Sequence, residues 1–219
     1  MELIKTLYLI LKTSKPVEEE ASKLRGYLAN RFKEYPILHQ HIKEAGYLYN
    51  YPRVQYKIID GTAVILGIEE GADILKKISD ELTELRLGKS AYKVESIQMT
   101  QMNAEFGLCR ENHHYKFITP WLALNPANYE RYKEMNDWKE KKEFLNGILV
   151  GNILSMCKSV DYVVTSKLYV HSRLDDEKVE YKAIPLIGFT GEFRVNFRIP
   201  DFFGLGKGVS QGFGVVKAF

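Results

Sequence analysis

The feature that most constrains the fold is the order of hydrophobic patterns in the first half of this 219-residue chain. Residues 3–11 alternate like a strand, and residues 17–32 carry apolar side chains at helical spacing. Two further strand patterns flank Asp60-Gly61, a pair that favours a type I′ hairpin turn. A second helical pattern from Ile74 through Leu85 is predicted to stop at Gly88, before a last strand. This β-α-β-β-α-β order predicts a ferredoxin-like domain.

The second half of the chain repeats such patterns less regularly. It contains a strand pattern from Tyr115, helical patterns over 128–135 and 138–158, and strand patterns over 189–197 and 215–219. Residues 162–170 and 179–184 suggest a hairpin around Asp175-Asp176. We therefore expect an α+β protein with two tandem ferredoxin-like domains, the second distorted. The predicted boundaries are 1–104 for the first domain, 105–112 for a linker and 113–219 for the second.

A glycine-rich segment between the last two strand patterns is the most unusual stretch of the chain. It has a Gly-apolar-Gly unit at Gly204–Gly206, Lys207-Gly208 after it, and a second such unit at Gly212–Gly214. A glycine loop between strands leaves main-chain N–H groups unshielded, so a phosphate chain can lie against it. Lys207 adds positive charge, and so do two nearby arginines of the preceding strand, Arg194 and Arg198.

Two common glycine motifs do not fit this segment. The dinucleotide fingerprint requires a third glycine and a following helix, but Val209 occupies the place of that glycine. The P-loop requires Ser or Thr after its lysine, but Gly208 follows Lys207. A simple flexible connection and a small-molecule phosphate site remain alternatives to a loop that holds a phosphate chain.

Two of the five histidines, His39 and His41, lie together after the first predicted helix. Rings and cations surround them in the sequence: Tyr35, Lys43, Tyr47, Tyr49, Tyr51 and Arg53. Aromatic and basic side chains interleaved in a loop suit RNA, because rings stack on bases and cations hold phosphates. The histidines could instead be packing residues or two ligands of a zinc ion, although zinc needs further ligands.

The glycine-rich segment resembles the glycine-rich loop of the RAMP superfamily, in particular of CRISPR-associated endoribonucleases that cut precursor crRNA within its repeats. Residues 119–129 and 151–155 look like the C-terminal domain of the subtype I-B Cas6 members. Residues 35–41 are similar to their paired-histidine segment. The resemblance implies two ferredoxin-like domains and cleavage of CRISPR repeat RNA.

Chemistry adds to what the resemblance implies for the site. RNA supplies its own nucleophile in the 2′-OH, and two imidazoles can serve as general base and acid near neutral pH. His39 and His41 are therefore the expected catalytic residues, with Tyr47, Tyr49 and Lys43 supporting them. The RNA-binding residues expected beside them are Arg53, Lys57, Arg194, Arg198, Gly204, Gly206, Lys207, Gly208, Gly212 and Gly214. We expect neither a metal nor a cofactor, and the products would be a 2′,3′-cyclic phosphate and a 5′-OH.

Composition sets limits on this interpretation. The formal net charge is only +3, so affinity for RNA must come from local clusters of charge. Two cysteines and the lack of a long apolar run predict a cytoplasmic protein that does not enter a membrane. A non-catalytic RAMP subunit that holds crRNA in an effector complex is the alternative function. Association with other CRISPR effector subunits and formation of a homodimer both stay open.

Overall fold

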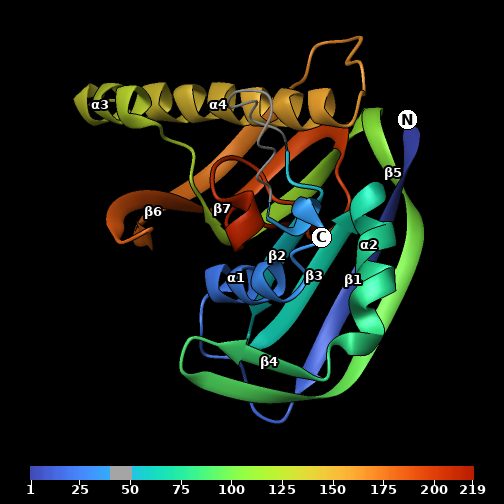
Figure 1. Cartoon of the computed structure of the whole chain (residues 1–219). Coiled ribbons are helices and arrows are strands. Elements are labelled where there is room, and N and C mark those ends of the chain that lie inside the picture. The colour runs from blue at the N-terminus through green and yellow to red at the C-terminus, as the bar shows by residue number, and fades with distance from the viewer. Residues whose placement is uncertain (40–50) are drawn as a thin grey trace. The chain divides into compact units, whose positions relative to one another are not determined.

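The computed structural model describes residues 1–39 and 51–219, and these residues form two compact units (Figure 1). The N-terminal unit contains Leu3–Ala104 together with Val209–Gly212. The C-terminal unit contains Met1–Glu2, Glu105–Gly208 and Phe213–Phe219. The short segment Val209–Gly212 therefore folds with elements that lie far from it in the sequence.

The sheet of the N-terminal unit is built from β1 (Glu2–Thr13), β2 (Val54–Ile59), β3 (Thr62–Ile68) and the first part of β5 (Ser90–Trp121). Antiparallel β3 pairs with both β1 and β2, and β5 lies beside β1. The resulting order, β5-β1-β3-β2, is that of a ferredoxin-like sheet. The predicted type I′ turn between β2 and β3 is confirmed, because φ is positive at both Asp60 and Gly61.

Two helices, α1 (Ala21–Arg31) and α2 (Glu70–Ile78), cover one face of this sheet (Figure 1). Alternate residues of β1 point at them, and Leu7, Leu9 and Leu11 are completely buried. Burying each such side chain contributes about 2–3 kcal/mol relative to leaving it in water. This core fixes α1 and β2, the two elements on which the candidate site is built.

The end of the second helical pattern differs from the prediction of a helix reaching Gly88. After α2, a 3₁₀ turn η2 (Ser79–Glu81) follows, and β4 (Glu84–Leu87) then pairs with the start of β5. Leu85 and Leu87 are both fully buried in the same core as the helix residues. The apolar residues between Leu82 and Leu87 are spaced in a way that fits both a further helical turn and an alternating strand. The pattern alone therefore does not distinguish helix from strand here.

The C-terminal unit has its own antiparallel sheet. β7 (Ile184–Arg198) pairs with β6 (Val170–Tyr181) on one side and with the second part of β5 on the other. A short last strand, β8 (Val216–Ala218), pairs with the opposite edge of β5. The order is β6-β7-β5-β8, a distorted version of the N-terminal sheet.

Two helices accompany this second sheet, as the sequence predicted. Asn125 caps α3 (Pro126–Glu134) by accepting a hydrogen bond from the Asn128 N–H, at 2.8 Å. Asp137 caps α4 (Trp138–Ser159) in the same way, accepting from a main-chain N–H of the first turn. The inner side of α4 buries an apolar stripe against the unit: Leu145, Leu149, Ile153, Met156 and Cys157.

Two segments of the C-terminal half differ from their predictions. Residues 105–112, expected to be a linker, are extended and belong to the long strand β5. The predicted hairpin turn at Asp175-Asp176 lies inside β6, and the true turn is Lys182-Ala183. Both turn residues have positive φ, a conformation usually signalled by Asn or Gly, so turn chemistry did not reveal it.

Neither cysteine forms a disulfide. Cys109 is half-buried, and burial raises the pKa of the Cys157 thiol to about 12. Among the residues that the structure describes, no helix is both long enough and apolar enough to cross a membrane.

Candidate functional site

His39 follows the short 3₁₀ helix η1 (Pro36–Leu38) and has a firmly held backbone. Its N–H donates to the Pro36 carbonyl at 2.9 Å, and its own carbonyl accepts a hydrogen bond from the guanidinium of Arg25 on α1. One residue earlier, the Leu38 carbonyl accepts from the hydroxyl of Tyr56 on β2, at 3.2 Å. Burial raises the pKa of this tyrosine, so it stays protonated as a donor. The half-buried His39 is thus attached to both α1 and β2.

The other predicted catalytic and supporting residues, His41, Lys43, Tyr47 and Tyr49, lie outside the described residues. Arg53, expected to bind RNA, forms an ion pair with Glu70 at 3.1 Å, and its side chain is only 19% exposed. The carbonyl of Arg53 also accepts the Ile68 N–H. These contacts tie Arg53 into the N-terminal unit.

Lys57 is completely buried, unlike a residue that meets an RNA phosphate. Its ammonium group donates to the side-chain oxygen of Gln55 at 3.2 Å, and Gln55 is buried too. Burial lowers the pKa of Lys57 to about 7. In this structure its charge therefore has no access to a solvent-borne ligand, which corrects the expectation that it lies on an RNA-binding surface.

The glycine-rich loop, residues 204–214, joins β7 to β8 and is extensively bonded within the protein. Its main-chain donors pair with carbonyls as follows: Leu205 with Gly214, Lys207 with Leu122, Gly212 with Val209, Phe213 with Gly208, and Gly214 with Pro120. A phosphate could reach these N–H groups only by breaking the bonds. The loop thus offers fewer main-chain donors than its composition suggested.

Close packing explains why glycine occupies this loop. Gly206 has φ +83°, and a Cβ there would lie 2.6 Å from the indole nitrogen of Trp121. That indole N–H donates to the Asn152 side chain at 2.9 Å, so helix α4 supports the residue beneath the loop. Gly214 has φ +65°, and a Cβ there would lie 2.0 Å from the Leu205 carbonyl oxygen. At both positions a side chain is excluded by the positive φ and by the lack of space for a Cβ.

The tip of the loop belongs to the N-terminal unit. The 3₁₀ turn η3 (Val209–Gln211) contacts α1 and β2. At Gly212, a Cβ would lie 2.9 Å from the Cβ of Ala21 on α1 and 3.2 Å from the carbonyl oxygen of Tyr56 on β2. His39 and the loop tip, more than half the chain apart, are therefore attached to the same helix and the same strand. Both segments are predicted site segments, and both contact α1 and β2 of the N-terminal unit.

A cluster of rings and cations, which sequence analysis missed, lies beside the rest of the loop. Tyr181, at the end of β6, packs edge-on against Phe213 with ring centroids 5.6 Å apart. The ammonium group of Lys207 lies 5.1 Å from the centre of the Tyr181 ring, and that of Lys182 lies 5.5 Å from it. The sequence pattern predicts this turn at Asp175-Asp176, so it does not identify Tyr181 and Lys182 as the tip of the hairpin.

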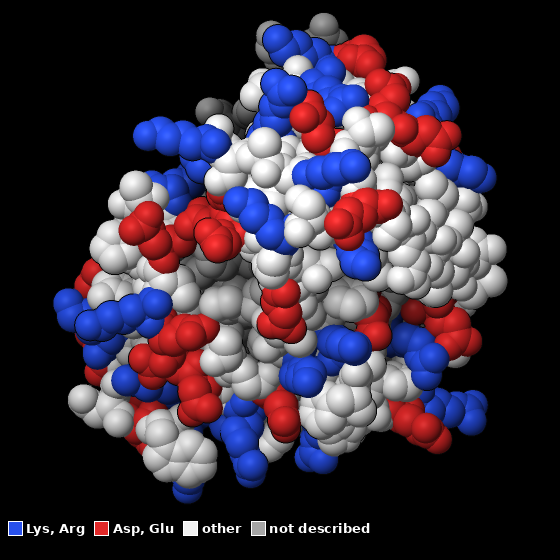
Figure 2. All heavy atoms as spheres, turned by 90° about the horizontal axis from the view of Figure 1, so that it is seen from below, with Lys and Arg blue, Asp and Glu red and all other residues white. Residues whose placement is uncertain are grey.

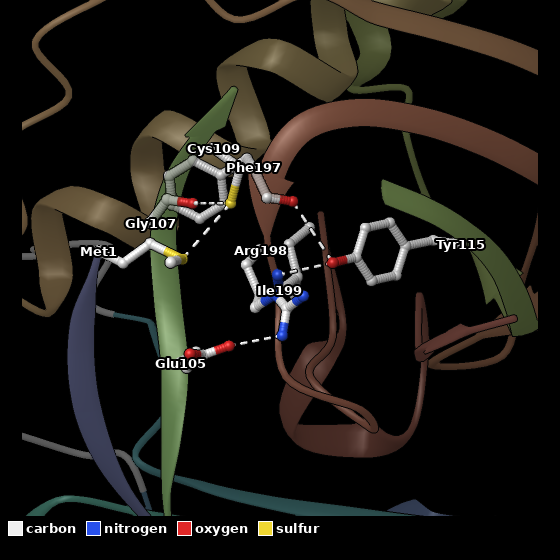
Figure 3. A network of polar contacts seen from close by, with 8 residues as sticks. All are labelled: Met1, Glu105, Gly107, Cys109, Tyr115, Phe197, Arg198 and Ile199. Carbon is white, nitrogen blue, oxygen red and sulfur yellow. Dashed lines mark hydrogen bonds and ion pairs between the residues drawn. The ribbon is translucent and has the colours of Figure 1, made fainter. Parts of the chain in front are cut away.

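Arg198 is part of a polar network in the C-terminal unit (Figure 3). Its guanidinium pairs with the Glu105 carboxylate, and both side chains are partly exposed. Beside it, the Tyr115 hydroxyl donates to the Phe197 carbonyl and accepts from the Ile199 N–H, at 3.3 and 2.9 Å. Burial raises the pKa of Tyr115 to about 12. The network fixes the end of β7, from which the glycine-rich loop departs.

Charge on the surface is mixed. On the face that Figure 2 shows, Lys and Arg side chains alternate with Asp and Glu, as the small net charge suggests. Within residues 1–39 and 51–219, no group of three or more His, Cys, Asp or Glu side chains is arranged to hold a metal ion. Recognition of a polyanion would therefore depend on local clusters of cations.

The chain folds into two ferredoxin-like units, with a glycine-rich loop before the last strand. Solved structures share this fold at low sequence identity. The structure of "a RAMP protein binding different RNA substrates" matches with a TM-score of 0.59 and 12% identity over 99% of each chain.

More similar proteins define the family. The model of the Cas6b N-terminal domain matches residues 2–105, and that of the Cas6b C-terminal domain matches residues 107–219. A crystal structure of Cas6b matches with a TM-score of 0.89 and 35% identity over 99% of this chain and 100% of the other. The chain therefore belongs to the Cas6b family.

Two further matches agree. A crystal structure described as the CRISPR RNA processing endoribonuclease Cas6b has a TM-score of 0.78 and 33% identity, over 98% of this chain and 100% of the other. A protein of Methanocaldococcus jannaschii, named uncharacterized protein MJ0978, is 47% identical over 136 residues, which are 62% of this chain and 92% of that protein.

Proposed function

We propose that this chain is an endoribonuclease that cuts CRISPR repeat RNA to release crRNA, without a metal ion. His39 and His41 are the catalytic pair in this proposal. Membership of the Cas6b family supports the choice of substrate and of reaction class. The observation that carries the assignment of the site is the attachment of His39 and the tip of the glycine-rich loop to the same two elements, α1 and β2.

The proposed reaction uses the nucleophile that RNA carries. One imidazole removes the proton of the 2′-OH, whose oxygen attacks the adjacent phosphorus. The bond from phosphorus to the 5′-oxygen breaks, and the second imidazole donates a proton to that oxygen. The products are a 2′,3′-cyclic phosphate and a 5′-OH, and the attack requires no metal-bound water. Either histidine can be the base, and the other is then the acid.

Positioning of His39 follows from the contacts of its backbone. Arg25 and Tyr56 donate hydrogen bonds to two successive carbonyls, those of His39 and Leu38, so α1 and β2 hold the backbone from which the His39 side chain extends. Accurate placement of an acid or base accounts for a large part of its effect, since an error of about 1 Å can reduce the rate roughly 100-fold. In this proposal the loop tip on the same elements holds the RNA next to the histidines.

The proposal is tested with a labelled cognate repeat RNA and enzyme in excess, in the presence of EDTA. The unmodified chain is expected to cut this RNA at an unchanged rate when EDTA is added. His39→Ala and His41→Ala should each reduce the rate about 100-fold or more, the usual range for a general acid or base. His113→Gln is the matched control, because it removes an imidazole from a half-buried position in β5.

The alternative of a non-catalytic crRNA-binding subunit predicts another result. Such a protein would bind the repeat tightly and leave it intact with or without EDTA. Equal cutting by the unmodified chain and the His39→Ala/His41→Ala double variant would instead remove the assignment of the histidines. Circular dichroism of each variant checks that the fold is retained.

A further inference from the structure

One face of the C-terminal sheet carries a row of basic side chains across three strands. Arg194 of β7 is the register partner of His171 on β6 and of His114 on β5. All three residues are exposed, whereas Phe193 and Val195, the neighbours of Arg194 in β7, are buried. Residues directly opposite each other on neighbouring strands point to the same face, with Cβ atoms about 5 Å apart. The row therefore spans roughly 10 Å.

The next row and helix α4 extend this positive surface. Glu192 of β7 lies between Arg173 of β6 and Lys116 of β5 in the register. From α4, the Lys142 ammonium approaches the Nε2 atom of His171 to 3.2 Å. We call His114, Lys116, Lys142, His171, Arg173 and Arg194 the cationic sheet face; Lys142 is half-buried and the other five are exposed.

The positive charges on this face are close enough to repel one another. The pKa of His171 is lowered, chiefly by Lys142, with further contributions from burial, Arg194 and Arg173, while Glu143 opposes them. Such crowding of cations raises the free energy of the unliganded face. A polyanion bound across this face would neutralise the cationic side chains and so remove the repulsion between them.

Exposed aromatic rings border the same face. Phe219, the last residue, is 63% exposed, and its ring lies edge-on against His114 at 6.1 Å. Tyr169, just before β6, is 62% exposed, and its N–H donates to the Asn196 side chain at 2.7 Å. The Lys167 ammonium lies 5.6 Å from the centre of the Tyr169 ring. Solvent-exposed aromatic side chains beside cationic ones suit unpaired nucleotides, because the bases stack on the rings while the cations neutralise the phosphates.

We propose that the cationic sheet face binds an unpaired segment of RNA next to the CRISPR repeat, with Tyr169 and Phe219 stacking on bases. The inference rests on the proposed function, since it concerns the same substrate. It adds a binding surface on the sheet of the C-terminal unit. Duplex RNA suits the face less well, because paired bases are not free to stack on the rings.

The first test measures binding of a fluorescent, unpaired oligouridine of about ten nucleotides to the full chain. Lys142→Gln with Arg173→Gln should weaken binding roughly three- to tenfold, and the slope of log K against log salt should become shallower by about 1.4, for two lost phosphate contacts. The matched control is Lys158→Gln with Lys178→Gln, which removes the same charge from exposed positions at the end of α4 and outside the face on β6. It should bind like the unmodified chain.

The second test addresses stacking. Tyr169→Ala should weaken oligouridine binding by about fivefold or more with little change in salt slope, whereas Tyr129→Ala on α3 should not. Either of two results would overturn the proposal. One is unchanged binding in both the Lys142→Gln/Arg173→Gln variant and Tyr169→Ala. The other is equal weakening of binding in the Lys158→Gln/Lys178→Gln control. Cleavage of a repeat without flanks is measured in parallel. If the unmodified chain cuts that repeat, a failed binding test concerns only this face; if it does not, the proposed function has failed independently.

Discussion

Gly212 and Ala21 pack so closely that a Cβ at Gly212 would lie only 2.9 Å from the Cβ of Ala21. The contact joins the tip of the glycine-rich loop to the first turn of α1. The same helix supplies Arg25, which holds the backbone of His39. The N-terminal unit therefore includes a piece of the C-terminal sequence at the helix that positions the proposed catalytic residue.

We predict that Gly212→Ala destabilises the protein. Its φ of +86° is unfavourable for alanine by about 1–2 kcal/mol, and the contact with Ala21 adds to this. The melting temperature should fall by about 2–8 °C. Gly26→Ala on α1 is the control, since a Cβ there meets nothing within 4 Å, and it should raise stability by roughly 0.5–1 kcal/mol. Equal melting temperatures for the two variants would contradict the packing argument.

Replacing Arg25 tests how His39 is positioned. Arg25→Gln should lower the single-turnover rate at saturating enzyme roughly 10- to 100-fold, because the His39 carbonyl loses its guanidinium partner. The enzyme concentration for half-saturation should change little, as the residue acts through His39. Lys23→Gln removes an exposed charge from the same helix and should retain the rate. A change confined to binding would indicate instead that Arg25 contacts RNA.

The Tyr181 ring at the tip of the β6–β7 hairpin should contribute to the binding of repeat RNA. Tyr181→Ala removes the surface over which Lys207 and Lys182 lie, and we expect repeat RNA to bind about five- to tenfold more weakly. Tyr181→Phe keeps the ring and should bind nearly like the unmodified chain. Filter binding at several salt concentrations measures both. If the phenylalanine variant is as weak as the alanine variant, the hydroxyl and not the ring is responsible.

Buried Lys57 should make stability depend on pH. Its pKa is about 7 in the folded protein, against about 10.4 when unfolded, so between these values the unfolded chain binds the extra proton. Stability should therefore rise with pH above 7, by at most about 1.4 kcal/mol per pH unit. Cys157 opposes this only above its unfolded pKa of about 8.5, because burial keeps its thiol protonated when folded.

Denaturant unfolding between pH 7.0 and about 8.5 isolates the lysine. The unmodified chain should gain stability across this range, whereas Lys57→Met should show a flat profile. Lys93→Met, at an exposed position of β5, should keep the rise. A rise that persists in Lys57→Met would show that another group titrates.

Much of the fold was predictable because local and tertiary preferences agree. The β2–β3 hairpin has Asp60-Gly61 at a turn that demands positive φ, and the stripe on α1 meets a continuous apolar sheet face. Prediction was wrong where two patterns fit equally, as at Leu85, and where a turn lacks its usual residues, as at Lys182-Ala183. The residue pattern over 105–112 also did not indicate that β5 continues through this segment.

The candidate site was predictable only in part. The histidine segment and the glycine-rich loop stand out by composition, but their common attachment to α1 and β2 is a tertiary contact with no local signal. The burial of Lys57 was not foreseen either, because a lysine in an alternating strand ordinarily indicates a solvated face. The cationic sheet face depends on the register of three strands, which residue spacing does not give.

The most direct test of the central claim is the mass of the RNA fragment upstream of the cut, made from cognate repeat RNA in EDTA. Our account predicts a 2′,3′-cyclic phosphate on that fragment, a 5′-OH on the other, and no cutting when the scissile nucleotide is 2′-deoxy. An upstream 3′-OH with a downstream 5′-phosphate, or cutting of the deoxy substrate, would contradict it.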